Sequence, residues 1–284
     1  MTYHSQVMGH SRMTDEVDTL ALHCSGASGR QWRRLQEHGA GAIRVIAPDL
    51  YGAGSVGQWH AQWHGQHAFS LADEAERILS LPELRNCRLH LVGHSYGGGV
   101  ALRIAAMIPE RIASLSLYEP SAFHLLHVLG PRGRAAFGDI RRVARAVADG
   151  LVTGDYAAGA QTFVDYWNGP GSWEAMKPEL QADVTRYVPK ACLDFHALFE
   201  EDMLRSAYGT FRFPVLIMSG EFAPAPTRVV AGGLAELIPG AVHARIAGAG
   251  HMGPCTHAEA VNARILAHIG KAARQHDALS LEAA

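Results

Sequence analysis

Short apolar segments with strand character alternate with helical patterns along most of this chain, and this alternation constrains the fold more than any other feature. The strand-like runs cover residues 17–22, 43–47, 88–92, 112–118, 215–219 and 242–247. The helical patterns fall at about 28–37, 71–79 and 96–108, and in a last segment that carries Val261, Ile265 and Ile269. Strand, helix and strand at this spacing predict βαβ units and a parallel sheet of the α/β class. Such sheets bind ligands at the carboxyl ends of their strands.

The composition fits a globular chain of this class. Of the 284 residues, 48% are hydrophobic, which suits one sizeable core or a core with a smaller subdomain. The formal net charge is −2, and the arginines between Arg132 and Arg145 alternate with apolar residues such as Ile140 and Val143. That spacing predicts the solvated face of a helix. We therefore expect no nucleic-acid partner.

The chain lacks the patterns that are typical of export or of a membrane span. Residues 1–18 are polar, and no run of 18 apolar residues occurs anywhere. We therefore expect a cytoplasmic protein with no membrane partner. The cysteines stand far apart without a CxxC pair, which predicts reduced thiols rather than a disulfide framework or a zinc site. They are Cys24, Cys87, Cys192 and Cys255.

Three histidines, His60, His64 and His67, recur at helical spacing in a loop-like stretch rich in Trp, Gln and Gly. Histidines at such spacing are one pattern of a metal site. No carboxylate or cysteine stands close to them in the sequence. We therefore predict no metal at this segment, and we expect no cofactor elsewhere in the chain.

Residues 121–208 interrupt the alternation of strands and helices. The segment is helix-rich and carries many aromatic side chains, among them Phe123, Phe137, Phe163, Tyr166, Trp167, Trp173, Phe195 and Phe199. Because it lies between two core strands, we predict a core domain of residues 1–120 and 209–284 with a helical cap of residues 121–208. The aromatic residues can build the cap's own small core or face a substrate, and both interpretations stay open.

One motif of the form G-x-S-x-G follows an apolar strand and opens an apolar helix. It reads Gly93-His94-Ser95-Tyr96-Gly97. The flanking glycines suit a strained strand-to-helix turn that lifts the Ser95 hydroxyl clear of the backbone. The N-terminus of the following helix favours negative charge that develops there. A structural serine in a glycine-rich turn is the plain alternative, but the strand and helix on either side favour a nucleophile.

A serine hydroxyl needs a base and a set of oxyanion donors before it can attack a carbonyl. His251 lies between the last strand-like run and the last helix, so we expect it at the same edge of the sheet as Ser95. Small residues follow the first strand at Ser25 to Ser28 and allow a backbone N–H to point into the site. We predict the N–H groups of Ser25 and Tyr96 as the oxyanion donors.

From about Val17 to Ile269 the chain resembles the α/β-hydrolase superfamily. The segments that carry the resemblance stand in order: LHCSGASGRQW, APDLYGAG, GHSYGG, the helical insertion and GAGHMGP. The resemblance implies a mostly parallel, eight-stranded sheet flanked by helices, with the cap inserted after the sixth strand. It also implies a serine hydrolase. Members usually have His-Gly in the oxyanion loop where this chain has His23-Cys24, a change that a backbone donor tolerates.

The resemblance places a triad acid after the penultimate strand, at the position of Ala223, which cannot orient a histidine. Glu221 lies in the same loop but two positions early. Glu119 follows the strand at 112–118, which should lie beside the nucleophile strand, and some superfamily members carry the acid there. We favour Glu119, with Glu221 as the alternative acid and the lack of any acid as a third possibility.

The expected activity is hydrolysis of a carboxylic ester through Ser95, His251 and Glu119, on a small, partly apolar substrate. Thioester or C–C bond cleavage, lactone opening, acyl transfer and cofactor-free peroxidase activity are alternatives on the same triad. A dehalogenase is not favoured, because that reaction needs a carboxylate where the motif offers a serine. A protein that binds a ligand without turnover is the alternative from a different class. The sequence leaves the oligomeric state open.

Overall fold

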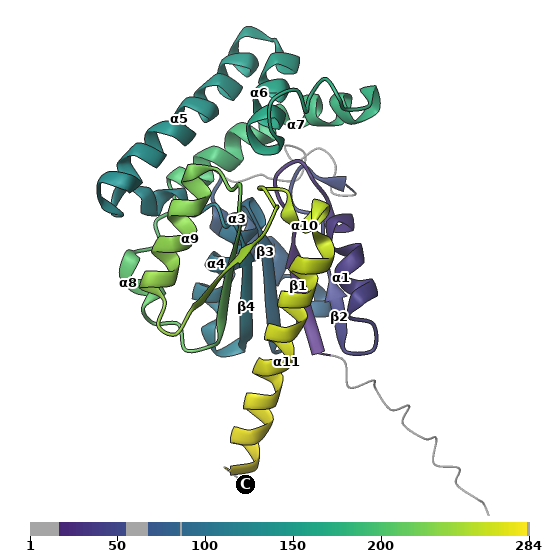
Figure 1. The fold of residues 1–284 in the computed structure, drawn as a ribbon, viewed down its shortest axis with the longest axis vertical. Helices are drawn as coiled ribbons and strands as arrows, with labels where there is room; N and C mark the ends of the chain where they lie inside the picture. The colour runs from purple at the N-terminus through teal and green to yellow at the C-terminus, as the bar shows by residue number, and fades with distance from the viewer. Residues whose placement is uncertain (1–16, 55–67, 86, 283–284) are drawn as a thin grey trace, which may run out of the picture.

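The computed structural model describes residues 17–54, 68–85 and 87–282. Its centre is a parallel sheet with the strand order β2-β1-β3-β4-β5-β6 (Figure 1). The strands are β1 (Val17–Leu22), β2 (Ile43–Ile46), β3 (Leu89–His94), β4 (Ile112–Tyr118), β5 (Val215–Gly220) and β6 (Val242–Ile246). The prediction of a parallel α/β sheet from the alternating pattern is confirmed.

Helices connect the strands and cover both faces of the sheet. Before the insertion they are α1 (Arg33–His38), α3 (Leu71–Leu79) and α4 (Tyr96–Met107). The insertion contributes α5 (Gly130–Thr153), α6 (Tyr156–Asn168), α7 (Pro178–Phe199) and α8 (Arg205–Tyr208), and the remainder contributes α9 (Ala225–Leu237), α10 (Gly253–Thr256) and α11 (Ala258–Glu282).

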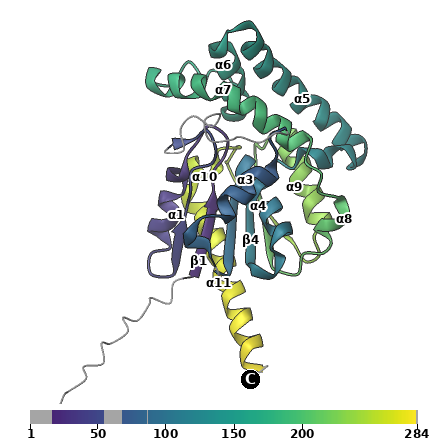
Figure 2. The same ribbon diagram turned by 180° about the vertical axis from the view of Figure 1, so that it is seen from behind.

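Alternate side chains of the strands enter two separate apolar clusters, as the period of two along a strand requires. On β1, Leu20 and Leu22 join one cluster and Ala21 joins the other. The first cluster contains residues of α3, α4 and α9, whereas the second contains Leu35 of α1 and Val261 of α11. The sheet is therefore the middle of three layers, which Figure 2 shows from behind. Burial on both faces explains why the strands read as continuous apolar runs.

The described residues hold six strands, where the resemblance implies eight. The helical insertion follows β4, the fourth of these six, where the resemblance implies a place after the sixth of eight. The two extra strands of the resemblance would precede β1, and residues 1–16 lie outside the described part. His60, His64 and His67 also lie outside it.

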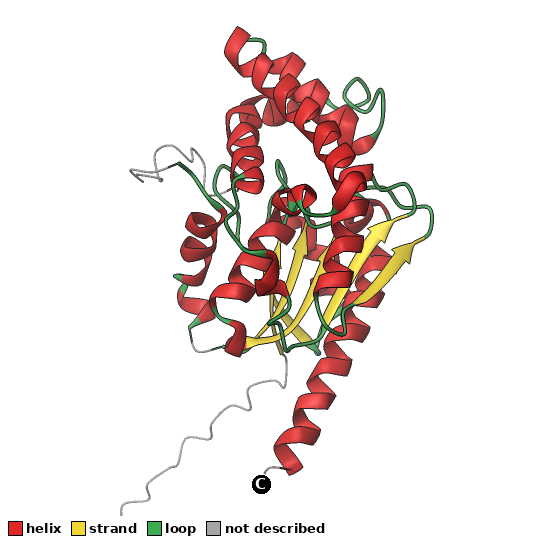
Figure 3. Cartoon of the chain, turned by 90° about the vertical axis from the view of Figure 1, so that its left-hand side faces the viewer, coloured by secondary structure: helices red, strands yellow, loops and turns green. Residues whose placement is uncertain are grey.

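The inserted helices α5, α6 and α7 lie above the edge of the sheet at which the strands end (Figures 1 and 3). This is the edge that carries Ser95 after β3 and Glu119 after β4. The functional candidates of the sequence are thus gathered between the sheet and the inserted helices. Within the described residues, no helix is long and apolar enough to cross a membrane.

Candidate active site

Ser95 occupies a sharp turn between β3 and α4. Its backbone has φ 54° and ψ −119°, a conformation that costs a residue with a side chain of the order of 1–3 kcal/mol. The turn is crowded: a Cβ atom at Gly97 would lie 2.4 Å from the carbonyl oxygen of His23. The glycine therefore lets the start of α4 approach the end of β1. The predicted strand–turn–helix context of the motif is confirmed.

A chain of hydrogen bonds joins Ser95, His251 and Glu119. The Nε2 atom of His251 lies 3.0 Å from the Oγ atom of Ser95, and its Nδ1 atom lies 2.7 Å from Oε2 of Glu119. All three side chains are buried: relative exposure is 6% for Ser95, 4% for His251 and 0% for Glu119. An imidazole with a carboxylate on Nδ1 has Nε2 free to accept the proton of a hydroxyl.

The carboxylate of Glu119 accepts two further hydrogen bonds. The N–H of Gly220 donates to Oε1 over 2.9 Å, and the Thr227 hydroxyl donates to Oε2 over 2.8 Å. Burial alone would raise the pKa of Glu119, but these bonds and the contact with His251 bring the pKa below its ordinary value. The carboxylate is therefore held ionised in one orientation.

Ala223 and Glu221 belong to the loop in which the resemblance places the acid, and neither takes part in the hydrogen bonds that join Ser95, His251 and Glu119. Ala223 is buried at 4% exposure and offers no acid. Glu221 turns toward solvent, where its Oε2 accepts the N–H of Gly248 over 3.0 Å and its Oε1 lies 3.5 Å from Arg245. Since Glu119 already contacts Nδ1 of His251, the structure brings Glu119 to the histidine and leaves Glu221 in a surface ion pair.

Tyr118 and His94 hold the loop that carries His251 through hydrogen bonds to its backbone. The Tyr118 hydroxyl donates to the carbonyl oxygen of Gly250 over 2.7 Å, and a Cβ atom at Gly253 would lie 2.0 Å from that hydroxyl. The Nε2 atom of His94 lies 2.9 Å from the carbonyl oxygen of His251. Burial lowers the pKa of His94 well below its usual value, so His94 is a neutral donor. These contacts set the position of the His251 backbone.

The loop after β1 places Ser25 beside Ser95 in the same pocket. His23 anchors this loop: its Nδ1 bonds the carbonyl of Cys24 at 2.8 Å and its Nε2 accepts the N–H of Leu50 at 3.0 Å. Burial lowers the pKa of His23 to about 4, which keeps the ring neutral. The N–H of Cys24 donates to Oε1 of Gln31 over 3.2 Å, so this amide is already engaged, and the Ser25 amide stays the predicted donor of this loop.

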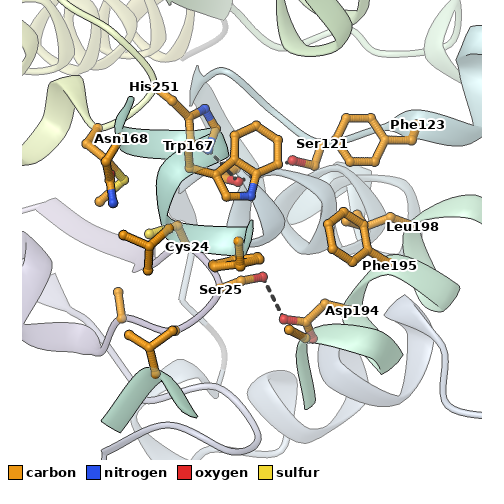
Figure 4. Close-up of a pocket in the computed structure, with 18 of the residues that line it drawn as sticks. Cys24, Ser25, Ser121, Phe123, Trp167, Asn168, Asp194, Phe195, Leu198 and His251 are labelled. Carbon is orange, nitrogen blue, oxygen red and sulfur yellow. Dashed lines mark hydrogen bonds between the residues drawn. The ribbon is translucent and has the colours of Figure 1, made fainter. Parts of the chain in front are cut away.

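A cavity of about 160 Å³ opens above Ser95. Figure 4 shows its walls, which are mostly apolar. The apolar lining residues are Ala27, Phe123, Phe163, Val164, Trp167, Met176, Val184, Ala191, Phe195, Leu198 and Met252. Several of the aromatic residues of the insertion thus face the cavity, whereas Phe137 and Phe199 pack edge to face with ring centroids 5.4 Å apart. The structure thus separates the aromatic residues that line the cavity from those that pack within the insertion, a distinction that the sequence left open.

Two residues at the site had no individual role assigned from the sequence. The Trp167 ring lies over His251 with ring centroids 4.2 Å apart and an angle of 31° between the planes (Figure 4). The Ser121 hydroxyl lies 3.2 Å from that of Ser95. Ser121 lies two residues after Glu119 in the sequence, and this position could have indicated that Ser121 belongs to the site. No pattern in the sequence distinguished Trp167 from the other aromatic residues. Among the described residues no cluster of potential metal ligands occurs.

Comparison with known proteins supports this fold. The family model of the alpha/beta hydrolase fold matches residues 20–258. The chain therefore belongs to the alpha/beta hydrolase fold family, and we assign it as an enzyme of the hydrolase class.

Individual relatives are more distant. Lipase LipV of Mycobacterium tuberculosis is 34% identical over 102 residues, and this match spans 36% of each chain. The putative carbamate hydrolase RutD of Pantoea ananatis is 27% identical over 88% of each chain. A thermophilic esterase from Thermogutta terrifontis has a similar fold, with a TM-score of 0.62, 21% identity and 90% of each chain covered.

Proposed function

We propose that this protein is a serine hydrolase that cleaves a carboxylic ester of a small, partly apolar substrate. The observation that carries the proposal is the uninterrupted chain from the Glu119 carboxylate through both nitrogens of His251 to the Ser95 hydroxyl. A lipase and an esterase are among the similar proteins, which supports the proposal.

In the proposed reaction, Oγ of Ser95 attacks the ester carbonyl while Nε2 of His251 takes the hydroxyl proton. The N–H groups of Ser25 and Tyr96 donate to the oxyanion of the tetrahedral intermediate. The Tyr96 N–H is available because it belongs to the first residue of α4 and has no acceptor within that helix.

Collapse of the intermediate breaks the bond to the alcohol, which leaves with the proton held by His251. An acyl group stays on Ser95. Water, deprotonated by the same histidine, then attacks the acyl carbonyl. Collapse of this second intermediate breaks the bond to Oγ of Ser95, which takes the proton back from His251, and releases the carboxylic acid. Throughout the cycle the Glu119 carboxylate holds Nδ1–H of His251 and stabilises the imidazolium.

We assign the roles of core and cap as the sequence suggested: residues 1–120 and 209–284 form the hydrolase core, and residues 121–208 form a cap. Support comes from the position of α5 to α7 above the strand ends (Figure 3) and from the cap residues that line the cavity. Trp167 of α6 and Phe195 of α7 are two of them. An apolar lining of this kind favours an apolar acyl or alcohol group.

The alternative of a ligand-binding protein without turnover arose from the missing acid at Ala223. The Glu119 carboxylate lies 2.7 Å from Nδ1 of His251 and can supply the missing acid, so this contact supports an enzyme rather than a protein that only binds a ligand.

Steady-state hydrolysis of short p-nitrophenyl esters tests the proposal. We expect saturable turnover by the wild type and a loss of at least about a thousandfold in kcat for Ser95→Ala. Exposed Ser80→Ala, which removes a surface hydroxyl that bonds the Arg77 carbonyl, is the control and should match the wild type. Turnover that survives in Ser95→Ala would reject Ser95 as the nucleophile.

A further inference from the structure

A network of buried charges connects helix α7 of the insertion with the loop after β1. Lys190 and Asp194 stand one helical turn apart on α7, with exposures of 1% and 2%, and their side chains form an ion pair. The Oδ2 atom of Asp194 also accepts hydrogen bonds of 2.6 Å from the hydroxyls of Ser25 and Tyr187. Figure 4 shows the bond between Ser25 and Asp194.

The same network extends to the start of helix α4. The Nζ atom of Lys190 lies 3.7 Å from Oε2 of Glu74, a residue of α3 with 0% exposure. That carboxylate oxygen accepts the Tyr96 hydroxyl over 3.2 Å. Lys190 also lies over the rings of Phe69 and Tyr96, 4.6 and 4.7 Å from their centroids.

The two ends of this network coincide with the two proposed oxyanion donors. Ser25 and Tyr96 supply the amides, and their side chains are the ones that Asp194 and Glu74 hold. Burial raises the pKa of Tyr96 well above its usual range, so its hydroxyl stays protonated and donates. Each donor residue is thus fixed at its side chain by a carboxylate, and Lys190 lies between the two carboxylates.

We propose that Glu74, Lys190 and Asp194 are positioning residues, which hold the amides of Ser25 and Tyr96 at the spacing that the oxyanion needs. This inference rests on the proposed function and adds to it. Through Lys190 and Asp194, the inserted helix α7 completes a part of the site that otherwise belongs entirely to the core.

Energetics favour such a role over a purely stabilising one. Removing charged side chains from water is costly, and a well-packed apolar set often stabilises a fold as well as a buried ion pair does. Hydrogen-bonded charges also orient the groups that they bind, because each carboxylate oxygen accepts hydrogen bonds only from defined directions. Oxyanion donors act only within a few tenths of an ångström of the right place.

Four variants test this inference with matched controls. Ser25→Ala and Tyr96→Phe each remove one hydroxyl from the network and leave the backbone amide in place. Ser114→Ala and Tyr208→Phe remove buried hydroxyls, which bond His90 and His124 away from the site. The measurements are kcat and KM for p-nitrophenyl butyrate, the inhibition constant of hexyl trifluoromethyl ketone, and the denaturant midpoint.

We expect Ser25→Ala and Tyr96→Phe to lower kcat about tenfold each, less than the hundredfold or more that follows loss of a whole donor. The KM should change less than about twofold, and binding of the ketone, whose adduct carries an oxyanion, should weaken by the factor lost in kcat. Ser25→Thr, which restores a hydroxyl, should recover most of the rate. Both control variants should lose stability without losing kcat.

Two results would overturn the inference, and they differ in what else they reject. If the wild type is active and the two network variants keep the kcat of their controls, the positioning role is wrong while the proposed function stands. If the wild type itself neither hydrolyses the ester nor binds the ketone, the proposed function fails and the inference fails with it.

Discussion

Ser95 and Glu119 both have a positive φ, which residues with side chains rarely adopt, and His251 connects them. Their φ angles are 54° and 43°, and they are the non-glycine residues with positive φ in the described part of the chain. Each directly follows one of two paired parallel strands, β3 and β4. Backbone strain of this kind is kept only where the surrounding structure enforces it, and such positions cluster at active sites.

The strain at Ser95 predicts a gain in stability when the nucleophile is lost. Ser95→Gly should raise the free energy of unfolding by about 1 kcal/mol relative to Ser95→Ala, because glycine adopts positive φ without steric cost. Both variants lack the hydroxyl, so the comparison isolates the backbone. Denaturant unfolding of the two proteins measures the difference. Equal midpoints would mean that the turn at Ser95 stores no strain.

Glu119→Gln should lower kcat/KM by at least about a hundredfold, since the corresponding change in serine protease triads costs about 10⁴ in kcat. The carboxylate accepts from Gly220, Thr227 and His251, and a glutamine has only one acceptor oxygen for these three donors. Its amide group also favours the wrong tautomer of the histidine. Ester hydrolysis under matched conditions measures the loss.

Glu221→Gln is the matched control for the acid. Its carboxylate contacts Gly248 and Arg245 at the surface, so we expect rates within about twofold of the wild type, as for an exposed ion pair. A large loss in Glu221→Gln together with an active Glu119→Gln would reverse the assignment of the acid.

Local motifs and strand order allowed much of the site to be predicted. The G-x-S-x-G pattern required a turn between a strand and a helix, and the parallel order of strands placed Glu119 next to Ser95. The contact between Ser25 and Asp194 could not be predicted in the same way, because 169 positions separate the two residues and Asp194 lies in no recognisable motif. It depends on how the inserted helices sit on the sheet.

The departures from the expected fold have a similar origin. Strand count and the place of the insertion came from a general resemblance rather than from residues of this chain, and six described strands replace the eight expected. The choice of Trp167 as the ring over His251 depends on the angle at which α6 crosses the site. A single sequence does not specify such an angle.

Trp167→Ala should lower kcat about tenfold. The indole lies 4.2 Å from the imidazole of His251, and an aromatic face stabilises a neighbouring cation by about 1–2 kcal/mol when both are desolvated. The proposed reaction forms the His251 imidazolium in the intermediate, so the loss should fall on kcat more than on KM. Trp167→Phe should retain most of the rate. Trp173→Ala, which is not among the residues lining the cavity, is the control. An unchanged kcat in Trp167→Ala would rule out this role.

Stability should fall as the pH drops from about 6.5 to 4. Burial lowers the pKa of His23, His90 and His124 to about 4 each, below the value of 6.5 in the unfolded chain. Between these values the unfolded state binds more protons, so the free energy of unfolding decreases toward acid. Each histidine contributes up to about 3 kcal/mol. Glu74 and Glu201, whose pKa burial raises, act in the opposite direction.

Urea unfolding at pH 7 and at pH 5 measures this slope. His90→Gln removes one of the titrating groups, and its partner Ser114 lies away from the proposed triad. We expect a shallower dependence on pH in that variant, whatever its stability at pH 7. A slope that rises toward acid in the wild type would contradict these histidine assignments.

Covalent labelling with a fluorophosphonate tests the central claim most directly, because only an activated serine beside oxyanion donors reacts rapidly with it. Intact mass and peptide mapping should find one adduct on the wild type, at Ser95, and none on Ser95→Ala. His251→Ala should label at least about a hundredfold more slowly, since the hydroxyl has lost its base. A wild type that stays unlabelled, or that carries its adduct on another residue, would contradict the account.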